Sequence, residues 1–302
     1  MANNKERNTG TSEDVLSYYA RNWEKIARCY DIDTSGLPVD PAWYRRRLYH
    51  DFIKRANPTS VLDIGCGGGW TVLDALQSGV NARGIEPVAE LKNFGSELLV
   101  KNGYPGDRIV QDDLAILSAL PDRSEDCIAL LSVLPHVPPQ NWDSVHTDIA
   151  RVLKTGGKFF AAYRNTLFDL YTFNSLTLEF YDRTLWATEA AKDLHNDDAL
   201  SSLKGLITNP DLPGPYHTMA ADKSFGALQR PKSNPLTIEA YLSTYDLQLD
   251  RIRFYHYHCA PPLMMQKLPG YKQINHGMEL QLSDDWRGHF MCAMFVVEVT
   301  KT

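Results

Sequence analysis

The segment Val61–Trp70, VLDIGCGGGW, carries the strongest structural signal in this 302-residue chain. Its first four residues are apolar apart from Asp63, which predicts a short buried strand. Glycines then crowd into the next positions, and the pattern WTVLDALQSG after them predicts a helix. This order opens a nucleotide-binding βαβ unit, because glycines allow a tight turn and a helix start offers free N–H groups to a ligand. A glycine turn without a ligand is the alternative, although glycine costs stability unless something approaches closely.

Two residues of this segment argue against a dinucleotide site. A dinucleotide fingerprint requires G-x-G-x-x-G, and Trp70 occupies the position of its third glycine. Asp63 would repel a pyrophosphate, but it suits a ligand with an ammonium or sulfonium group. The order D-x-G-x-G-x-G resembles the first motif of class I S-adenosylmethionine-dependent methyltransferases. The resemblance implies S-adenosylmethionine as the cofactor, bound by the motif residues Asp63, Gly65, Cys66, Gly67 and Gly69.

Composition and charge restrict the class of protein. A net charge of −6 argues against a general nucleic-acid or anionic-membrane surface, which would need basic clusters. The run 45–47, three arginines, lies in a helical pattern and is interpreted as a solvated face from which one arginine could reach a ligand carboxylate. The five cysteines form no C-x-x-C pair, which fits a reduced intracellular protein. No apolar run approaches the ~18 residues of a membrane span, and residues 1–13 resemble a disordered polar tail, so a cytoplasmic protein is expected.

From Ser60 onward, short apolar strands alternate with helices, which indicates a parallel sheet with helices on both faces. The predicted strands are 60–64, 81–85, 108–111, 126–132 and 157–163, and the predicted helices are 70–78, 88–102, 113–119 and 141–153. After a helix in LTIEAYLSTYDLQ, LDRIRFYHYH predicts a sixth strand and HFMCAMFVVEVTK a seventh, with a loop expected over 258–288. In the resembled family the last strand is antiparallel. The expected fold class is therefore α/β, with a Rossmann-like, seven-stranded, mostly parallel sheet, an antiparallel last strand and a helical cap insertion.

The segments around this core are expected to cover the ligand. The core itself is expected at 59–165 and 236–302. Residues 14–58 predict two helices that cover the sheet edge or form a lid, and Tyr19 and Tyr30 are candidate substrate contacts there. Plain packing is the alternative explanation for these aromatic residues.

Residues 166–235 are too long for an ordinary connection and too apolar for a simple linker. They are interpreted as a cap over the substrate, with helices in TLFDLYTFNSLTLEFYD and TEAAKDLHNDDALSSLKGL. A Pro/Gly-rich loop follows these helices and contains His217, another candidate substrate contact. Packing or a homodimer interface would also explain the apolar surface of this segment.

Acidic residues follow the second and third strands, at the edge where ligands bind to parallel sheets. Glu86, just before Pro87, lies about 20 residues beyond the glycine turn, where a carboxylate accepts hydrogen bonds from both ribose hydroxyls. An acid favoured by the helix dipole is the alternative. The third strand ends in Asp112, Asp113 and Leu114. The resembled family commonly carries an acid here for the adenine, and Asp113 fits this position better, although Asp112 replaces the family's glycine and a helix cap is the competing role.

Histidines follow the fourth and sixth strands. In the resembled family the end of the fourth strand faces the reactive methyl group, which assigns Ser132 to the cofactor site and makes His136 a candidate general base. A buried, hydrogen-bonded histidine is the alternative. His256 and His258 share one face of the sixth strand and are further catalytic candidates. Zinc binding by these two histidines together with Cys259 is an alternative. No second ligand cluster of matching spacing follows, so no metal is expected.

Together these features predict methyl transfer from S-adenosylmethionine to a small molecule, with an oxygen atom of a sugar or other small metabolite as the favoured acceptor. Carbon or nitrogen methylation of a ring-bearing molecule, as in the quinone-type methyltransferases that the chain resembles, is the nearest alternative. A non-catalytic cofactor-binding protein is a further alternative, while Trp70 and Asp63 disfavour an oxidoreductase. Methyl transfer depends mainly on positioning, so the motifs identify the cofactor site and leave the acceptor open.

Overall fold

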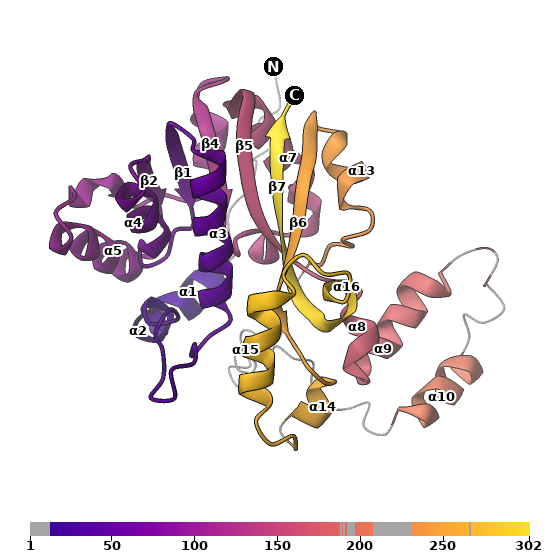
Figure 1. The fold of residues 1–302 in the computed structure, drawn as a ribbon. Helices are drawn as coiled ribbons and strands as arrows, with labels where there is room; N and C mark the ends of the chain where they lie inside the picture. Colours follow the sequence, from indigo (N-terminus) through magenta and orange to yellow (C-terminus); the bar gives the residue numbers. More distant parts are fainter. Residues whose placement is uncertain (1–12, 188, 190, 192–196, 208–230, 266) are drawn as a thin grey trace.

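A seven-stranded sheet forms the centre of the molecule (Figure 1), with the strand order β3-β2-β1-β4-β5-β7-β6. The computed structural model describes residues 13–187, 189, 191, 197–207, 231–265 and 267–302. Residues 1–12 and His217, both subjects of sequence-based predictions, lie outside the described residues. The strands are β1 (Ser60–Ile64), β2 (Asn81–Ile85), β3 (Ile109–Val110), β4 (Glu125–Leu130), β5 (Leu153–Arg164), β6 (Leu247–Tyr257) and β7 (Cys292–Lys301).

The strand directions confirm the predicted fold class. β1 pairs in parallel with β2 and β4, β3 pairs in parallel with β2, and β5 pairs in parallel with β4. β7 is antiparallel to both β5 and β6. As a consequence β6 runs parallel to β5, and the carboxyl ends of all strands except β7 meet at one edge of the sheet. We refer to this edge as the carboxyl edge.

Helices cover both faces of the sheet. On one face, α3 (Ala42–Ala56), α4 (Trp70–Gln77) and α5 (Ala89–Lys101) bury residues such as Phe52, Val72 and Leu99. On the other face, α7 (Trp142–Val152) and α13 (Ile238–Ser243) bury Ile149 and Leu242. The remaining short elements between β2 and α7 are η1 (Gly106–Arg108), α6 (Ile116–Ala119), η2 (Leu134–His136) and η3 (Pro139–Asn141).

The N-terminal segment lies beside the glycine turn. The single helix predicted from residue 14 is interrupted at Asn22, whose side-chain amide donates to the backbone oxygen of Tyr18. The two resulting helices are α1 (Glu13–Arg21) and α2 (Trp23–Ala27). α2 reaches the start of α4, because the indole N–H of Trp70 donates to the backbone oxygen of Ala27 over 3.0 Å.

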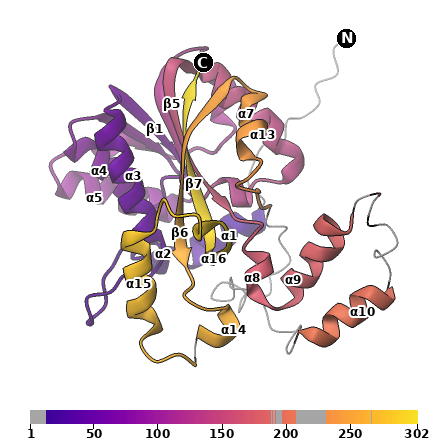
Figure 2. The same ribbon diagram turned by 45° about the vertical axis from the view of Figure 1, so that its right-hand side comes forward.

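The first of the two long helices predicted after β5 is absent, and the described residues of this segment form short helices. They are α8 (Asp169–Thr172), α9 (Ser175–Phe180), the π-helical turn η4 (Tyr181–Leu185) and α10 (Asp197–Leu206), and they stand to one side of the sheet (Figure 2). The first predicted helix breaks because Phe173 adopts a left-handed conformation (φ 52°). Asn174 then caps α9, since its side chain accepts the Leu176 N–H.

The loop expected over residues 258–288 is wrong, because this connection between β6 and β7 contains helices. They are α14 (Pro262–Met265), α15 (Tyr271–Gln281) and α16 (Gly288–Met291). α15 is fixed by a polar contact rather than an apolar stripe: the buried carboxylate of Glu279 accepts the backbone N–H of Tyr257 over 2.7 Å. Apolar periodicity cannot indicate an anchor of this kind.

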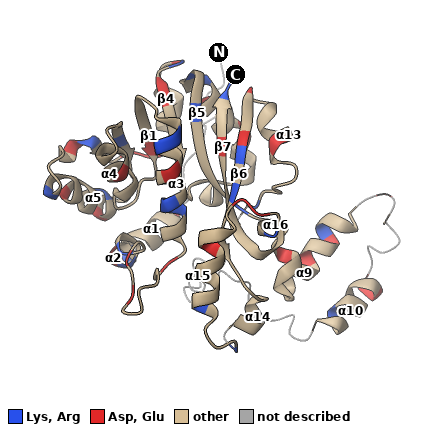
Figure 3. Ribbon diagram, in the orientation of Figure 1, with Lys and Arg blue, Asp and Glu red and all other residues tan. Residues whose placement is uncertain are grey.

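Charged residues of both signs are mixed along individual elements. Figure 3 shows basic and acidic residues interspersed on α3, α5 and β6, for example. Within the described part of the chain, none of the helices combines the length and the apolar character that crossing a bilayer requires.

Candidate active site

The glycine turn after β1 is held against the end of β2. Gly65 and Cys66 donate their backbone N–H groups to the oxygen of Ile85, over 2.7 and 3.0 Å. Gly65, Gly67 and Gly69 all have positive φ, between 55° and 76°, which L side chains rarely adopt. The motif therefore forms the tight turn that its sequence predicts, at the carboxyl edge of the sheet.

Two of these glycines also lie where a side chain would collide with neighbours. A Cβ atom on Gly65 would come within 2.5 Å of the Val133 side chain, and one on Gly69 within 2.6 Å of the Ile109 side chain. A Cβ atom on Gly67, in contrast, would meet no atom within 4 Å. Space therefore lies over Gly67, at the tip of the turn.

Glu86 lies next to that space, as its spacing from the glycine turn predicts. Its carboxylate accepts the Gly67 N–H over 2.8 Å and the Val88 N–H over 3.0 Å. The residue is only 4% exposed, and burial raises the pKa of its carboxyl group to about 7. Each carboxylate oxygen has a second lone pair, so the group can accept two further hydrogen bonds from a diol.

Asp63 lies beneath the glycine turn and is fully buried. The Thr71 hydroxyl donates to one of its carboxylate oxygens, Oδ2, and among the described residues the other oxygen has no hydrogen-bond donor. Burial raises the pKa of Asp63 to about 7, against the opposing effects of the Thr71 hydrogen bond and of the nearby Arg45 cation. Asp63 is therefore a negatively charged or readily ionised group directly under the proposed ligand site.

Arg45 of α3 is a further candidate site residue, which the sequence-based interpretation of the run 45–47 does not single out from the other arginines. Its Nη1 atom donates to the hydroxyl of Ser132, which follows β4 in a left-handed conformation (φ 72°). Its Nε atom is buried and has no hydrogen-bond acceptor in the described part of the structure. A signal was present in the spacing, since Arg45 precedes the buried Tyr49 and Phe52 by four and seven residues and so shares the buried face of the helix.

Arg46 behaves differently from its neighbour, so the interpretation of the arginine run as a solvated face is wrong for both residues. It forms a two-point ion pair with Asp74, with N–O distances of 2.6 and 2.7 Å. Its guanidinium group lies 5.1 Å from the ring centre of Tyr30 and 4.8 Å from that of Trp70. The rings of Tyr30 and Trp70 thus pack against the Arg46 guanidinium at the start of α4.

The residues predicted around the adenine lie at the start of α6. Asp112 accepts the backbone N–H of Asp113, and Asp113 accepts the N–H of Ala115, each over 2.8 Å. These contacts form a turn before α6, whose N-cap residue is Ala115, and no described side chain caps this helix, so the helix-cap role expected as an alternative for Asp113 is not present. Leu114 is buried, and the backbone oxygen of Pro87 accepts a hydrogen bond from Gln111, which links the ends of β2 and β3.

His136 and Tyr19 form a pair beside the glycine turn. The Tyr19 hydroxyl of α1 lies 3.0 Å from Nε2 of His136, and their rings meet edge to face with centres 5.5 Å apart. Burial raises the pKa of Tyr19, and Arg45 and Glu86 are both close enough to influence it electrostatically. Tyr19, predicted as a substrate contact, and His136, predicted as a general base, thus lie together next to the residues expected to bind the cofactor.

His256 and His258 lie at the carboxyl end of β6, with ring centres 4.9 Å apart. His256 has a positive φ of 63°, and burial lowers its pKa to about 4. Burial also lowers the pKa of His258, whose Nδ1 lies 3.1 Å from the sulfur of Met265. Both imidazoles are therefore neutral at pH 7. Among the described residues no group of three or more His, Cys, Asp or Glu side chains could hold a metal ion.

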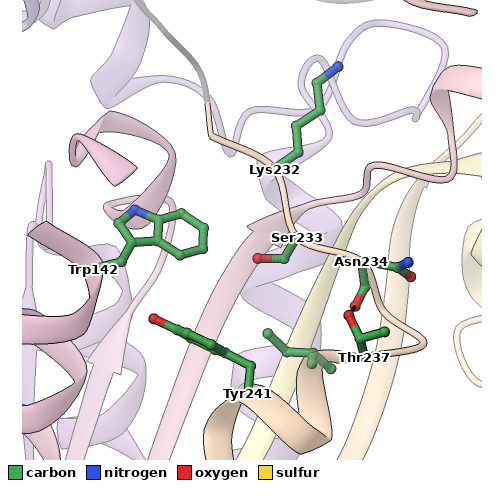
Figure 4. A pocket seen from close by; sticks show the side chains of 7 residues that line it. Trp142, Lys232, Ser233, Asn234, Thr237 and Tyr241 are labelled. Carbon is green, nitrogen blue, oxygen red and sulfur yellow. Dashed lines mark hydrogen bonds between the residues drawn. The ribbon is translucent and has the colours of Figure 1, made fainter. Parts of the chain in front are cut away.

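A cavity of about 240 Å³ lies between α7 and the segment 231–238. Trp142 and Tyr241 line one side of it and Ser233 and Thr237 the other, with the Tyr241 hydroxyl directed toward Trp142 (Figure 4). Its walls are connected to the carboxyl edge, because the Trp142 indole N–H donates to the Val137 oxygen over 3.1 Å. Trp142 therefore links the wall of the cavity to Val137, the residue after His136.

Comparison with known proteins identifies relatives of the central part of the chain. Residues 62–161 match a family model described as "Methyltransferase domain". A ubiquinone biosynthesis O-methyltransferase from Dechloromonas aromatica is 32% identical over 122 residues, which are 40% of this chain and 50% of that protein. The protein of the same name from Xanthomonas axonopodis pv. citri is 27% identical over 164 residues, or 52% of this chain and 66% of the relative. The chain thus matches half to two thirds of the length of these two relatives.

The fold has neighbours among solved structures. Magnesium protoporphyrin IX methyltransferase (ChlM) from Synechocystis PCC 6803, crystallised with bound SAM, aligns with a TM-score of 0.53 and 11% identity, covering 96% of this chain and 98% of that chain. An identity this low shows a common fold and leaves the acceptor of the present protein open.

Proposed function

We propose that this protein, which carries a class I S-adenosylmethionine-dependent methyltransferase domain and uses S-adenosylmethionine as its cofactor, methylates a hydroxyl oxygen of a ring-bearing small molecule. The observation that carries the proposal is the position of the His136–Tyr19 pair beside the Glu86–Gly67 contact. A proton acceptor and a ribose-binding group thereby lie at the same edge of the sheet. The O-methyltransferase relatives support oxygen as the attacked atom.

The residues present fit the cofactor. Glu86 has lone pairs for two ribose hydroxyls, and the open space over Gly67 allows the nucleoside to approach the backbone. The buried Nε of Arg45, which has no acceptor among the described residues, suits the carboxylate of the methionine part. Asp63 beneath the turn would balance the positive charges of the ammonium and sulfonium groups. Bound, the cofactor supplies an electrophilic methyl group.

The residues around His136 would prepare the acceptor. A hydroxyl oxygen attacks well only when its proton is removed, and a histidine imidazole is the usual proton acceptor near neutral pH. The hydrogen bond between Tyr19 and Nε2 of His136 would hold the ring in one orientation. For the ring to act as the base, Nε2–H must donate to the Tyr19 oxygen, so that Nδ1 is the nitrogen that accepts the proton. A phenol, whose ordinary pKa is about 10, is an easier substrate for such a base than an alcohol. These properties favour a phenolic ring over a sugar as the acceptor.

Cofactor binding provides the first test of this proposal. Calorimetry with S-adenosylmethionine and with NAD should show binding of the first alone. Glu86→Ala should weaken binding of S-adenosylmethionine about 100-fold, since it removes two hydrogen bonds to a charged acceptor worth about 1.5–3 kcal/mol each. Glu90→Ala, an exposed acid in the first turn of α5, serves as the matched control and should leave binding unchanged. Equal binding by wild type and Glu86→Ala would reject this cofactor site.

Methyl transfer is tested separately. The purified full chain with S-adenosylmethionine is incubated with catechol, catechol derivatives and, for comparison, methyl glucoside, and the release of S-adenosylhomocysteine is measured. Release with catechols and not with the glucoside is the expected result. Cofactor binding without turnover of any phenol would contradict the proposed acceptor class.

A further inference from the structure

Arg164, the last residue of β5, provides a buried positive charge at the carboxyl edge. It follows Phe160 and Ala162, which are buried under α3, so strand alternation directs its side chain to that face of the sheet. Pairing across the sheet places Arg164 opposite Met294 and Met294 opposite Tyr255. The residue is only 6% exposed. A guanidinium buried to this degree is costly to desolvate and is retained where it has a specific role.

The backbone around Arg164 is fixed from both sides. The Ser233 N–H donates to the Arg164 oxygen over 2.8 Å, and the Thr166 N–H donates to the Ser233 oxygen over 3.0 Å. The side-chain amide of Asn165 donates to the oxygens of His289 and Cys292, over 2.8 Å each. Arg164 therefore projects from a rigid junction of β5, β7 and the segment before α13, as a ligand-orienting residue must.

The surroundings of Arg164 place it on the acceptor side of the site. Burial raises the pKa of Tyr19, and the positive charge of Arg164 lowers it. Burial lowers the pKa of His256, and the charge of Arg164 lowers it further. Both groups therefore lie within electrostatic range of the guanidinium. Tyr19 contacts His136, the proposed base, whereas His256 belongs to β6, on the side away from the glycine turn. In the strand order, β5, which ends at Arg164, lies between β4, which leads into His136, and β6.

Arg45 and Arg164 both influence Tyr19, but their other neighbours differ. Arg45 bonds to Ser132 and influences Asp63, beneath the glycine turn, so it faces the cofactor. Arg164 influences His256 and Asp169. Asp169 is paired with Lys232 over 2.5 Å, so in the described part of this corner the lysine charge is already balanced. A ligand group near Arg164 would therefore meet one guanidinium, which matches a monoanion better than a dianion.

We propose that the methyl acceptor carries a carboxylate on the ring that bears its reactive hydroxyl, and that Arg164 binds this carboxylate while His136 faces the hydroxyl. The planar guanidinium group can donate two parallel hydrogen bonds to a carboxylate, which fixes the orientation of a ring as well as binding it. Existing contacts of Arg164 with the protein would orient the group for this purpose. The inference rests on the proposed methylation of a ring hydroxyl and specifies its substrate class.

The test compares two probes of equal shape and different charge. The full chain is saturated with S-adenosylhomocysteine, which prevents turnover, and is titrated calorimetrically with 3,4-dihydroxybenzoate and with 3,4-dihydroxybenzamide. The acid should bind at least about 10-fold more tightly than the amide, since hydrogen bonds between charged partners contribute about 1.5–3 kcal/mol. Equal affinity for the two probes, or binding of neither, would overturn the proposal. Failure of S-adenosylhomocysteine itself to bind would instead reject the proposed function.

Variants then assign the effect to one residue. Arg164→Met should abolish the preference for the acid while leaving S-adenosylhomocysteine affinity within about twofold, and Arg164→Lys should retain part of the preference. Arg251→Met, which removes a half-exposed arginine of β6 paired with Asp284, is the matched control and should keep the full preference. A preference that survives in Arg164→Met would overturn the assignment. If Arg164→Met does not fold, the Arg164→Lys variant and the comparison of acid with amide in the wild type still decide the question.

Discussion

The hydroxyl of Tyr19 lies 3.0 Å from Nε2 of His136, although 117 positions separate the two residues in the chain. The contact joins the N-terminal helix α1 to the turn after β4. If His136 is the proposed base, this contact sets the orientation of its ring. The pair therefore links the N-terminal segment to the proposed chemistry.

Replacement of His136 should affect chemistry more than binding. We expect His136→Ala to lower kcat about 100- to 10,000-fold, the usual contribution of a general base, with S-adenosylmethionine affinity nearly unchanged. Tyr19→Phe should lower kcat only about 2- to 10-fold, because it removes one hydrogen bond to the base. Steady-state kinetics with a catechol acceptor and calorimetry with S-adenosylhomocysteine separate the two quantities. An unchanged kcat in His136→Ala would assign the histidine to packing.

Replacement of Arg45 should weaken the cofactor. We expect Arg45→Met to raise the Kd for S-adenosylmethionine about 10- to 100-fold, because a charge-assisted hydrogen bond to the methionine carboxylate is lost. Lys54→Met, an exposed cation on the same helix, is the matched control and should leave the Kd unchanged. Methylthioadenosine, which lacks the amino-acid part, should bind both Arg45→Met and the wild type equally. A loss of its binding as well would indicate general disruption of the site.

Cofactor affinity should fall as the pH is lowered through 7. Burial raises the pKa values of Asp63 and Glu86 to about 7, so both carboxyl groups become protonated below this pH. A protonated carboxyl loses its negative charge and part of its acceptor capacity, so each required group should weaken binding by up to about 10-fold per pH unit. Binding should also release protons near pH 7, because the cofactor favours the ionised forms.

Calorimetry between pH 5.5 and 8.5 measures this dependence, and buffers of different ionisation enthalpy report the proton release. In Glu86→Gln one of the two titrating groups is removed, so the slope below pH 7 should decrease. Affinity that stays constant across this range would show that neither carboxylate must ionise for binding.

Replacement of Asn165 should destabilise the fold without involving the ligand. Its buried amide group donates to two backbone oxygens over 2.8 Å and its Oδ1 accepts the Leu167 N–H over 3.0 Å. Asn165→Ala leaves these buried groups without partners, so the free energy of unfolding should fall by about 2–4 kcal/mol. Denaturant unfolding of the variant and of Asn102→Ala, an exposed control, measures the difference. A fall below about 0.5 kcal/mol would contradict the anchoring role.

The first half of the fold could be predicted from the sequence because the patterns that indicate it are local. The motif after β1 combines the apolar strand, the left-handed glycines and the helix start within ten residues, and the position of Glu86 follows from the length of one βαβ unit. Asp113 shows the limit of this approach: its type and position suit both an adenine contact and a helix cap, and the structure shows instead a turn contact with the Ala115 N–H before the uncapped helix α6.

Other features depend on contacts between distant segments. The spacing of Arg45 indicates a buried helix face, but the approach of that face to Ser132 depends on how α3 packs on the sheet. The helix α15 was missed because its anchor is the buried Glu279, a residue that apolar patterns treat as exposed. No sequence pattern predicts the contact between Tyr19 and His136.

The antiparallel direction of β7 has an evolutionary consequence. Because β7 reverses the chain, β6 ends at the carboxyl edge, and the connection with α14 and α15 emerges there, as does the segment that follows β5 (Figure 1). Both of these connections begin in the half of the sheet that lies away from the glycine turn. The one that follows β5 contains the cap expected from the sequence over residues 166–235. We therefore expect exchange of these two connections between homologous chains to alter substrate choice while Gly67 and Glu86 remain in place.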